Sequence, residues 1–359
     1  MSRCETLLEC FRYSDWARDK LLELATGLTA AQLDEPFEMG AGSLRATLQH
    51  LYGAERVWFE RWQGTPQPQF PPARDLPAVE DLSRAWHALG QARDHRLLTL
   101  ADDGLETAVQ YTNPDGQRRS VPLGDILLHV GNHGVHHRAQ ALNMLRRLGV
   151  KVPGLDYLFI KCERPTIEYE AGERAALRAM GFAVSEQVVP SPPWDLGTIR
   201  AYYRYNDWAQ QRVLAAAEPL GDVDLDRPFE IGLGTLRRTL LHLRDAEQWW
   251  LDNWTRDAPG AFAQLPESTT MAELKGVFTQ TAAARNAHLA GLTNEALQRV
   301  TAAEVRPGVR LRFRLGETML QLCAHGTHHR AQALNMLRHV AAPTPPLDYV
   351  AMWLEIHGG

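Results

Sequence analysis

The chain has 359 residues, of which 45% are hydrophobic and 23% charged, with a formal net charge of −5, as expected of a globular protein with room for two domains. No run of Lys or Arg stands out, so the composition argues against binding to nucleic acid or to a membrane surface. The N-terminal segment is charged throughout, unlike a signal peptide, and no stretch is apolar over the length of a membrane span. Four cysteines, at positions 4, 10, 162 and 323, show no framework of disulfides and are typical of reduced thiols in the cytoplasm.

The first part of the chain predicts helices joined by long loops. Residues 2–27 have an apolar face among charged residues, which predicts an amphipathic helix. Residues 43–63 predict a second helix with His50 beside its core-facing stripe, which consists of Leu44, Leu48, Leu51, Glu55, Trp58 and Trp62. A Pro-rich loop follows, long enough to let a third helix at 78–101 cross the bundle instead of turning straight back.

A turn-rich segment and a long helix come next. Residues 108–122 contain Asn-Pro-Asp-Gly between β-favouring runs, which predicts a small hairpin. Residues 122–148 predict a fourth helix, whose inward stripe is Leu123, Leu127, Val130, Gly134, His137, Ala141, Met144 and Leu148. After Pro153, the segment LDYL opens a short final helix. Residues 162–194 hold one short helix, at 171–180, and end in a Pro-rich run typical of a linker.

The rest of the chain repeats the first part at a constant offset of 192 residues. GNHGVHHRAQALNMLRR at 131–147 returns as CAHGTHHRAQALNMLRH at 323–339. The same offset links Asp156-Tyr157 to Asp348-Tyr349, and Trp16, a predicted core anchor, to Trp208. Residues 162–194 have no counterpart. We therefore predict two copies of one all-α domain, at 1–163 and 195–359, joined by a linker at 164–194.

Three histidines in each copy have the spacing of a metal site. His133 and His137 lie one helical turn apart on one face, so both imidazoles can reach one cation. His50 would complete a three-nitrogen face and leave coordination positions open for water or substrate. The ligands predicted for the second copy are His242, His325 and His329. All six recur at the constant offset, whereas His87, His95 and His129 do not. Imidazoles that converge in a helical core without a cation would leave unpaired polar groups, which is costly.

The dipeptide at 136–137 makes one ligand ambiguous, because His136 also lies one turn from His133. His137 occupies a core-facing position of the helix. His136 falls on the polar side with His129, Gln140, Asn143 and Arg147. The pattern therefore favours His137 as the ligand and His136 as a supporting or surface residue. In the second copy it favours His329 over His328.

The predicted ligands indicate the chemistry of the site. Three neutral imidazoles leave the charge of a cation uncompensated, so a bound water or thiol becomes easier to deprotonate. No Glu lies between His133 and His137, unlike the pattern of zinc peptidases. Four residues are candidate catalytic groups: Glu55 and Glu247 for acid/base or supporting roles, and Arg138 and Arg330 for orienting an anionic substrate. An ordinary surface position is an equally good interpretation of the two arginines.

At these residues the sequence resembles the DinB/YfiT-like superfamily of metal-dependent proteins. The resemblance rests on the histidine of the second helix, on HGVHHRAQ and HGTHHRAQ, and on the tryptophan of the first helix, and it covers both copies. It implies two tandem four-helix bundles, each with a long crossover and one divalent metal ion, zinc or nickel, at the histidines named above. Members usually have one domain and often form dimers. The tandem therefore resembles a fused dimer, with two bundles about a pseudo-two-fold axis in a monomeric chain.

Characterised members include bacillithiol S-transferases and the mycothiol-dependent maleylpyruvate isomerase, in which a low-molecular-weight thiol is activated at the metal. The resemblance thus implies a cytoplasmic, stress-response enzyme of the metal-dependent thiol S-transferase class, with a small-molecule substrate and a thiol cosubstrate. Two alternatives stay open. One is a metal-dependent hydrolase that uses a metal-bound hydroxide, and the other is a non-catalytic protein stabilised by its metal ions.

Overall fold

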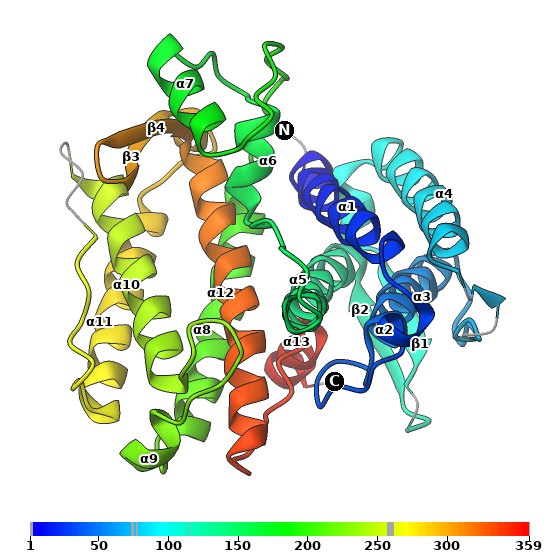
Figure 1. Cartoon of the computed structure of the whole chain (residues 1–359). Coiled ribbons are helices and arrows are strands. Elements are labelled where there is room, and N and C mark those ends of the chain that lie inside the picture. Colours follow the sequence, from blue (N-terminus) through cyan, green and yellow to red (C-terminus); the bar gives the residue numbers. More distant parts are fainter. Residues whose placement is uncertain (1–2, 73–74, 77, 114, 257–261, 359) are drawn as a thin grey trace. The chain divides into compact units, whose positions relative to one another are not determined.

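A computed structural model describes residues 3–72, 75–76, 78–113, 115–256 and 262–358, and in these ranges the chain is mostly helical (Figure 1). The all-α prediction is confirmed. None of the described helices is both long and apolar enough to span a membrane. The chain divides into two compact units, one made of Ser2–Pro153 with Pro346–Gly359 and the other of Gly154–Pro345.

The first unit contains four long helices that pack in a ring. Each of them agrees with its predicted range to within three residues at either end. Helix α1 packs against α4 and α5, and α3 packs against the same two helices, so α1 and α3 occupy opposite corners of a four-helix bundle. The bounds are α1 Arg3–Thr26, α3 Leu44–Trp62, α4 Val79–Leu98 and α5 Leu123–Arg147.

The chain crosses this bundle at two connections, and neither is the connection that the sequence predicted to cross it. The Pro-rich loop joins α3 to α4, which are neighbours in the ring, so that prediction was wrong. The chain crosses the bundle instead between α1 and α3 and between α4 and α5. Both crossing segments carry structure of their own, α2 (Ala30–Leu33) in the first and η2 (Asp102–Glu106) with a hairpin in the second. A folded connection can cover a bundle end more completely than a loop rich in Pro.

The predicted hairpin is present in both repeats. Strands β1 (Ala108–Thr112) and β2 (Arg118–Pro122) are antiparallel, with Ala108 opposite Pro122. Strands β3 (Val300–Arg306) and β4 (Val309–Arg314) pair in the same way. Pro114, in the predicted turn, lies outside the described residues. Because β2 and β4 run directly into α5 and α12, each hairpin fixes the start of the helix that carries two of the candidate ligands.

The second unit repeats the ring of helices. Helix α8 packs against α11 and α12, and α10 packs against the same pair. The bounds are α8 Leu196–Ala217, α9 Asp222–Leu225, α10 Leu236–Thr255, α11 Met271–Ala290, η3 Glu295–Gln298 and α12 Leu315–His339.

The loop before α10 makes a close approach to α12. Gly232 has φ +52°, and a Cβ atom there would lie 2.2 Å from Oε1 of Gln332. Glycine is the residue that tolerates both the left-handed backbone and this proximity. Thr235 then caps α10 by accepting a hydrogen bond from the amide of Arg238 at 3.1 Å. The loop therefore sets both the start of α10 and the position of Gln332.

The short final helix of each repeat is confirmed, as α6 (Tyr157–Glu163) and α13 (Tyr349–His357), but the compact units do not follow the predicted domain boundaries. Helix α6 follows the first repeat in sequence and packs on α12, whereas α13 packs on α5. Each of the long helices α5 and α12 is therefore covered by the short final helix of the other repeat.

The predicted linker is also part of a compact unit. Its short helix is confirmed as α7 (Ala171–Ala179). The side chains of Tyr169 and Trp194 are buried, the latter only 1% exposed, and Glu173 forms an ion pair with Arg312 at 2.6 Å. An apolar residue as large as Trp194 stabilises a packed segment, whereas a free linker would expose it to water.

Candidate metal centres

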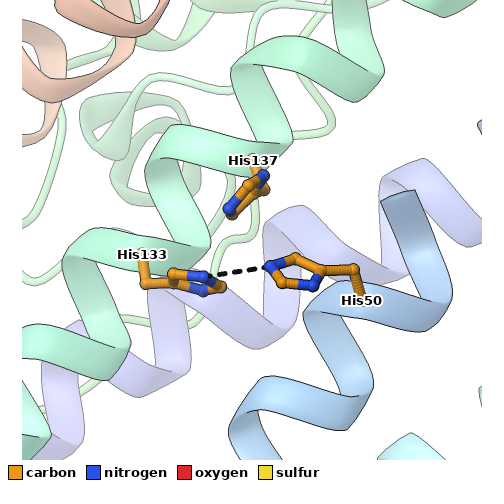
Figure 2. Close-up of side chains that lie close together, drawn as sticks. All are labelled: His50, His133 and His137. Carbon is orange, nitrogen blue, oxygen red and sulfur yellow. Dashed lines mark hydrogen bonds between the residues drawn. The ribbon is translucent and has the colours of Figure 1, made fainter. Parts of the chain in front are cut away.

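Three histidines of the first unit converge on one point (Figure 2). His50 lies on α3, and His133 and His137 lie on successive turns of α5. The Nε2 atoms of His50 and His133 are 3.3 Å apart, and the ring centre of His137 lies 4.6 Å and 4.4 Å from those of His50 and His133. One nitrogen from each ring lies within 4.8 Å of the others. The three predicted residues thus come together, with His137 and not His136 as the third.

The second unit has the same arrangement. His242 of α10 meets His325 and His329 of α12. The Nε2 atoms of His242 and His325 are 3.0 Å apart, and the ring of His329 lies 4.7 Å and 4.4 Å from the rings of His242 and His325. The spacing of the first triad is therefore reproduced to within a few tenths of an ångström.

A glutamine holds the third imidazole of each triad. Oε1 of Gln140 accepts a hydrogen bond from Nδ1 of His137 at 2.7 Å, which leaves Nε2 of that ring as the lone-pair donor. The amide nitrogen of Gln140 lies 3.1 Å from Nε2 of His136. Gln332, His329 and His328 repeat these contacts at 2.8 Å and 3.0 Å. His136 therefore supports Gln140 and does not face the triad.

Burial favours the neutral form of five histidines in the triads, namely His50, His133, His137, His242 and His329. Burial, together with the charges that His136 and His50 would carry, lowers the pKa of His137 to about 3. Burial and the neighbouring His325 lower the pKa of His242 to about 4. Burial acts in the same direction on the pKa of His50, and it depresses the pKa values of His133 and His329 far more strongly. Three imidazole nitrogens within 4.8 Å of one another form the donor set of an open divalent metal site, so the residues present fit such an ion.

Comparisons with known proteins agree with this geometry. A model of the DinB family matches residues 1–169 and 196–355. The chain belongs to the DinB family. The protein DinB of Bacillus subtilis (strain 168) is 21% identical over 154 residues, which cover 41% of this chain and 88% of that protein. No solved structure gives a significant match.

One prediction about the surroundings of the first triad in this DinB-family chain was wrong. His129 and Asn143 were assigned to the polar side of α5, yet their side chains are only 4% and 3% exposed. Helix α13 covers that side of α5. The sequence of α5 alone contains no sign of this cover, because the covering residues lie about 200 positions away.

Helix α6, which covers α12, brings a carboxylate to the second triad. Oδ1 of Asp156, at the start of α6, lies 3.4 Å from Nδ1 of His325 and accepts a hydrogen bond from the amide of Gln321 at 3.0 Å. Burial alone would raise the pKa of Asp156, but the hydrogen bond from His325 keeps the pKa well below its usual range. A carboxylate behind a histidine orients the ring and makes it a better ligand. The recurrence of Asp156-Tyr157 as Asp348-Tyr349 was the sequence signal for this role.

Asp156→Asn is expected to weaken metal binding at the second triad by about 10- to 100-fold, the usual effect of losing such a carboxylate. The affinity of the first triad should not change, because Asp156 belongs to the other compact unit. Competition with a chromogenic chelator measures both affinities. Asp348→Asn is the matched control and should leave the second triad unaffected. Equal affinity at the second triad in wild type and Asp156→Asn would show that the contact has no supporting role.

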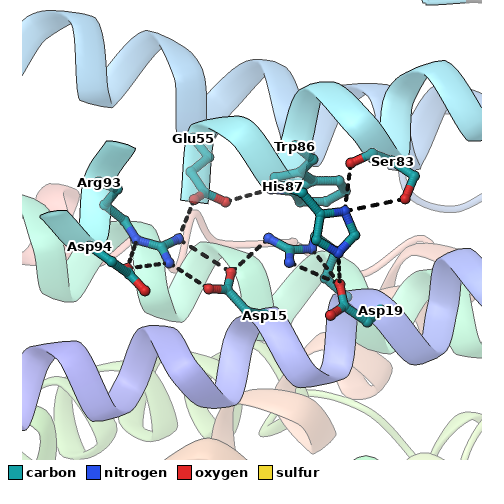
Figure 3. Close-up of polar contacts among 9 residues, drawn as sticks. Asp15, Asp19, Glu55, Ser83, Trp86, His87, Arg93 and Asp94 are labelled. Atoms are coloured by element: carbon teal, nitrogen blue, oxygen red, sulfur yellow. Dashed lines mark hydrogen bonds and ion pairs between the residues drawn. The ribbon is translucent and has the colours of Figure 1, made fainter. Parts of the chain in front are cut away.

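The candidate acid/base residues of the DinB-family chain, Glu55 and Glu247, form ion pairs with arginines. Figure 3 shows the ion pair of Glu55. Oε1 of Glu55 pairs with the guanidinium of Arg93 at 2.5 Å, and its Oε2 accepts a hydrogen bond from Nε1 of Trp86 at 2.7 Å. Arg93 also pairs with Asp15 at 2.6 Å and with Asp94 at 2.6 Å. The network ties α1, α3 and α4 together, so Glu55 has a structural role in this arrangement.

The second repeat has the same network, with Arg285 between Glu247 and Asp207. Burial raises the pKa of Glu247, and Arg285 opposes that effect. The sequence reasoning missed Arg93 and Arg285, although they recur at the offset of 192 that revealed the histidines.

The two candidate arginines lie inside the bundles. Arg138 is 5% exposed and lies over the ring of Tyr13, with 5.0 Å from guanidinium carbon to ring centre. Arg330 is 3% exposed and lies 5.6 Å from the ring of Tyr205. Burial lowers the pKa of Arg330. The interpretation of these residues as ordinary surface arginines is therefore wrong.

An aromatic cavity adjoins the second triad. Its volume is about 320 Å³, and it lies wholly within Gly154–Pro345. His242, His325 and Asp156 form its polar part, and its apolar wall includes Phe159, Phe182, Trp249, Trp250 and Phe262. The segment that has no counterpart in the first repeat supplies Phe182. The second triad thus has a pocket wall that the sequence repeat does not provide to the first.

In the metal-free protein, we expect the free energy of unfolding to fall as the pH falls from about 6.5 towards about 4. The folded chain depresses the pKa values of His137 and His242, whereas an unfolded His keeps a pKa near 6.5. The unfolded state therefore binds more protons in this window, and each residue contributes at most about 1.4 kcal/mol per pH unit. Above about pH 7 these residues are neutral in both states and the contribution is constant.

Thermal melts of chelator-treated protein at about pH 7.5 and about pH 5 measure this effect. A His137→Asn, His242→Asn double variant is the control and should show a weaker dependence on pH. The same dependence in the variant and the wild type would assign the effect to other groups.

Proposed function

We propose that the chain is a metal-dependent transferase that activates a low-molecular-weight thiol at a three-histidine centre and transfers it to a small-molecule electrophile. The observation that supports this most is the convergence of three imidazoles in each unit, with no carboxylate among the donor atoms that the described residues bring together there. A zinc or nickel ion held there would make a bound thiol acidic enough to act as a nucleophile at neutral pH. Membership in the DinB family, shown by the sequence match, also supports the proposal.

Residues around each triad orient its histidines for such a reaction. Gln140 and Gln332 each hold one imidazole with its Nε2 lone pair directed at the triad, and Asp156 does the same for His325. The aromatic cavity beside the second triad offers apolar surface to an electrophile.

The glutamate carboxylates near the triads are engaged in ion pairs, which favours thiol transfer over hydrolysis. Glu55 and Glu247 are engaged by Arg93 and Arg285 and are poorly placed to take a proton from water. A thiol that is already ionised needs no such base, whereas hydrolysis of a stable bond usually does.

Thiol consumption tests the proposal. Zinc- or nickel-loaded protein is incubated with cysteine or glutathione and the electrophile 1-chloro-2,4-dinitrobenzene, and loss of thiol is followed over time. We expect metal-dependent acceleration that a His137→Ala, His329→Ala double variant loses. His357→Ala, a substitution on the exposed end of α13, is the control and should retain the rate. A rate equal to that of free metal, or one retained in the double variant, would contradict the proposal.

Chelation separates an enzyme from a protein that its metal only stabilises. Removal of metal from an open, catalytic centre should leave the helix content nearly unchanged, whereas removal of a structural ion should unfold the bundle. Far-ultraviolet circular dichroism before and after chelation distinguishes the two.

We also propose that the chain is a monomer with the two bundles paired about a pseudo-two-fold axis. The ungapped offset of 192 residues supports this, because equivalent surfaces can then pair as in a symmetric dimer. Sedimentation at several concentrations tests it, and a dimer at low concentration would contradict it.

A further inference from the structure

A large cavity that opens to solvent lies among the four long helices of the second bundle. Its volume is about 620 Å³, within the range of pockets that bind small molecules. Gln210 of α8, Phe278 of α11 and Arg330 of α12 line it, and the ring of His325 closes one part of the wall. The cavity therefore reaches the second triad from inside the bundle.

The corresponding place in the first bundle is nearly filled. The cavity there has a volume of about 20 Å³, enough for about one water molecule. At the offset of 192, Arg18 stands where the second repeat has Gln210, and Trp86 stands where it has Phe278. The guanidinium of Arg18 lies 5.7 Å from the ring of Trp86. Two larger side chains thus occupy the space that is open in the second bundle.

Two residues that line the open cavity carry a buried donor without a partner. Nε2 of Gln210 and Nε of Arg330 have no hydrogen-bond partner among the described residues. Gln210 is 8% exposed and Arg330 is 3% exposed, so bulk water does not readily compensate them. Unpartnered buried donors are costly, and each such group in a folded protein calls for an explanation. These two nitrogens have almost no accessible surface, so a ligand in the cavity accepts from them only when the side chains of Gln210 and Arg330 turn towards it.

The charges around the cavity indicate which acceptor group a ligand there would carry. Asp207 and Glu247 are both paired with Arg285. The hydrogen bonds of Arg330 go to neutral partners, the side-chain oxygens of Asn206 and Thr327. No carboxylate in the described part of the chain lies within ion-pair distance of this guanidinium, although the charge of Glu247 favours its protonated form from farther away. A buried cation is stabilised by an anion of matching geometry, and a carboxylate matches the planar guanidinium.

We propose that the cavity of the second bundle is a binding site for a small molecule that combines a carboxylate with an apolar body. The carboxylate accepts from Arg330 and Gln210, and the apolar body lies against Leu214, Phe278 and Leu322. The first bundle, filled by Arg18 and Trp86, does not bind this class of ligand. The site concerns binding alone and does not depend on the thiol-transfer proposal.

Calorimetry with 2-naphthoate and its neutral analogue 2-naphthamide tests the site on the full-length, metal-loaded protein. We expect one naphthoate per chain and an affinity for the amide at least about tenfold lower, because the amide leaves the charge of Arg330 uncompensated. The double variant Gln210→Arg, Phe278→Trp introduces the residues that the first bundle already accommodates. It should weaken naphthoate binding by at least about tenfold, with both metal ions retained.

A Trp86→Phe variant, altered only in the first bundle, is the matched control and should bind naphthoate at the second bundle as the wild type does. Arg330→Met is a second test that removes the charge without filling the space, and it should remove the preference for acid over amide. A carboxylate bound directly to a metal ion would survive the double variant. Naphthoate binding unchanged in that variant, equal affinities for acid and amide, or no binding of naphthoate would each overturn the proposal.

Discussion

His137→Ala is expected to lower the metal content at saturating zinc from two ions to one ion per chain. The substitution removes one of three imidazoles, and His50 and His133 alone supply fewer protein ligands than open zinc sites use. The second triad lies in the other compact unit, so it should keep its ion. Elemental analysis of protein freed of loosely bound metal gives the stoichiometry.

His136→Ala is the matched control, because the two histidines are adjacent on α5. The Nε2 atom of His136 contacts the side-chain amide of Gln140, and His136 is outside the group of three histidines that could hold the ion. The content should therefore stay at two ions per chain, with a modest loss of affinity at the first triad. Loss of the first ion in His136→Ala would show that the ligand assignment is wrong, and a wild-type protein that binds one ion at saturation would refute the presence of two centres.

Arg93→Met is expected to destabilise the first bundle by about 3 kcal/mol, the lower end of the range for a broken buried ion pair. Arg93 is only 3% exposed, and its removal leaves Glu55 and Asp15 without their cation between three packed helices. Because the chain has two compact units, urea unfolding should be followed with probes that resolve two transitions. The transition of the first bundle should shift to lower urea, and that of the second should not.

Arg84→Met on the same helix separates this effect from the loss of any arginine. Arg84 pairs with Asp81 at the surface, where its side chain is 74% exposed. Exposed ion pairs contribute between about 0 and 1 kcal/mol, so the urea midpoint should hardly move. Equal shifts in the two variants would mean that the network in Figure 3 adds nothing beyond a surface pair.

Local patterns along the sequence were reliable guides to local structure. The 4,3 spacing of apolar residues predicted α3 and α5, and the Asn-Pro-Asp-Gly turn predicted the hairpin of β1 and β2. The core-facing position of His137 also pointed to it, and not to His136, as the residue that lies beside His50 and His133. These predictions succeed because helical periodicity and turn chemistry depend on residues a few positions apart.

Contacts between distant segments were where the sequence reasoning failed. Nothing near His129 in sequence indicates that its side chain is buried, and the role of Asp156 depends on the packing of α6 against α12. The Pro-rich loop suggested a crossing that the ring order of the helices rules out. The partners of Glu55 were missed because Arg93 lies on another helix.

The sequence by itself determined the all-α class, the duplication at an offset of 192 residues and the two sets of three histidines, since each is written in local spacing or in direct repetition. Only the tertiary structure decided which repeat covers which helix and which carboxylate reaches His325. It also decided why the space among the four long helices is filled in the first bundle and open in the second. Those features depend on the volumes and charges of side chains that meet across helices. The sequence contains these side chains but does not show, before folding, which of them will become neighbours.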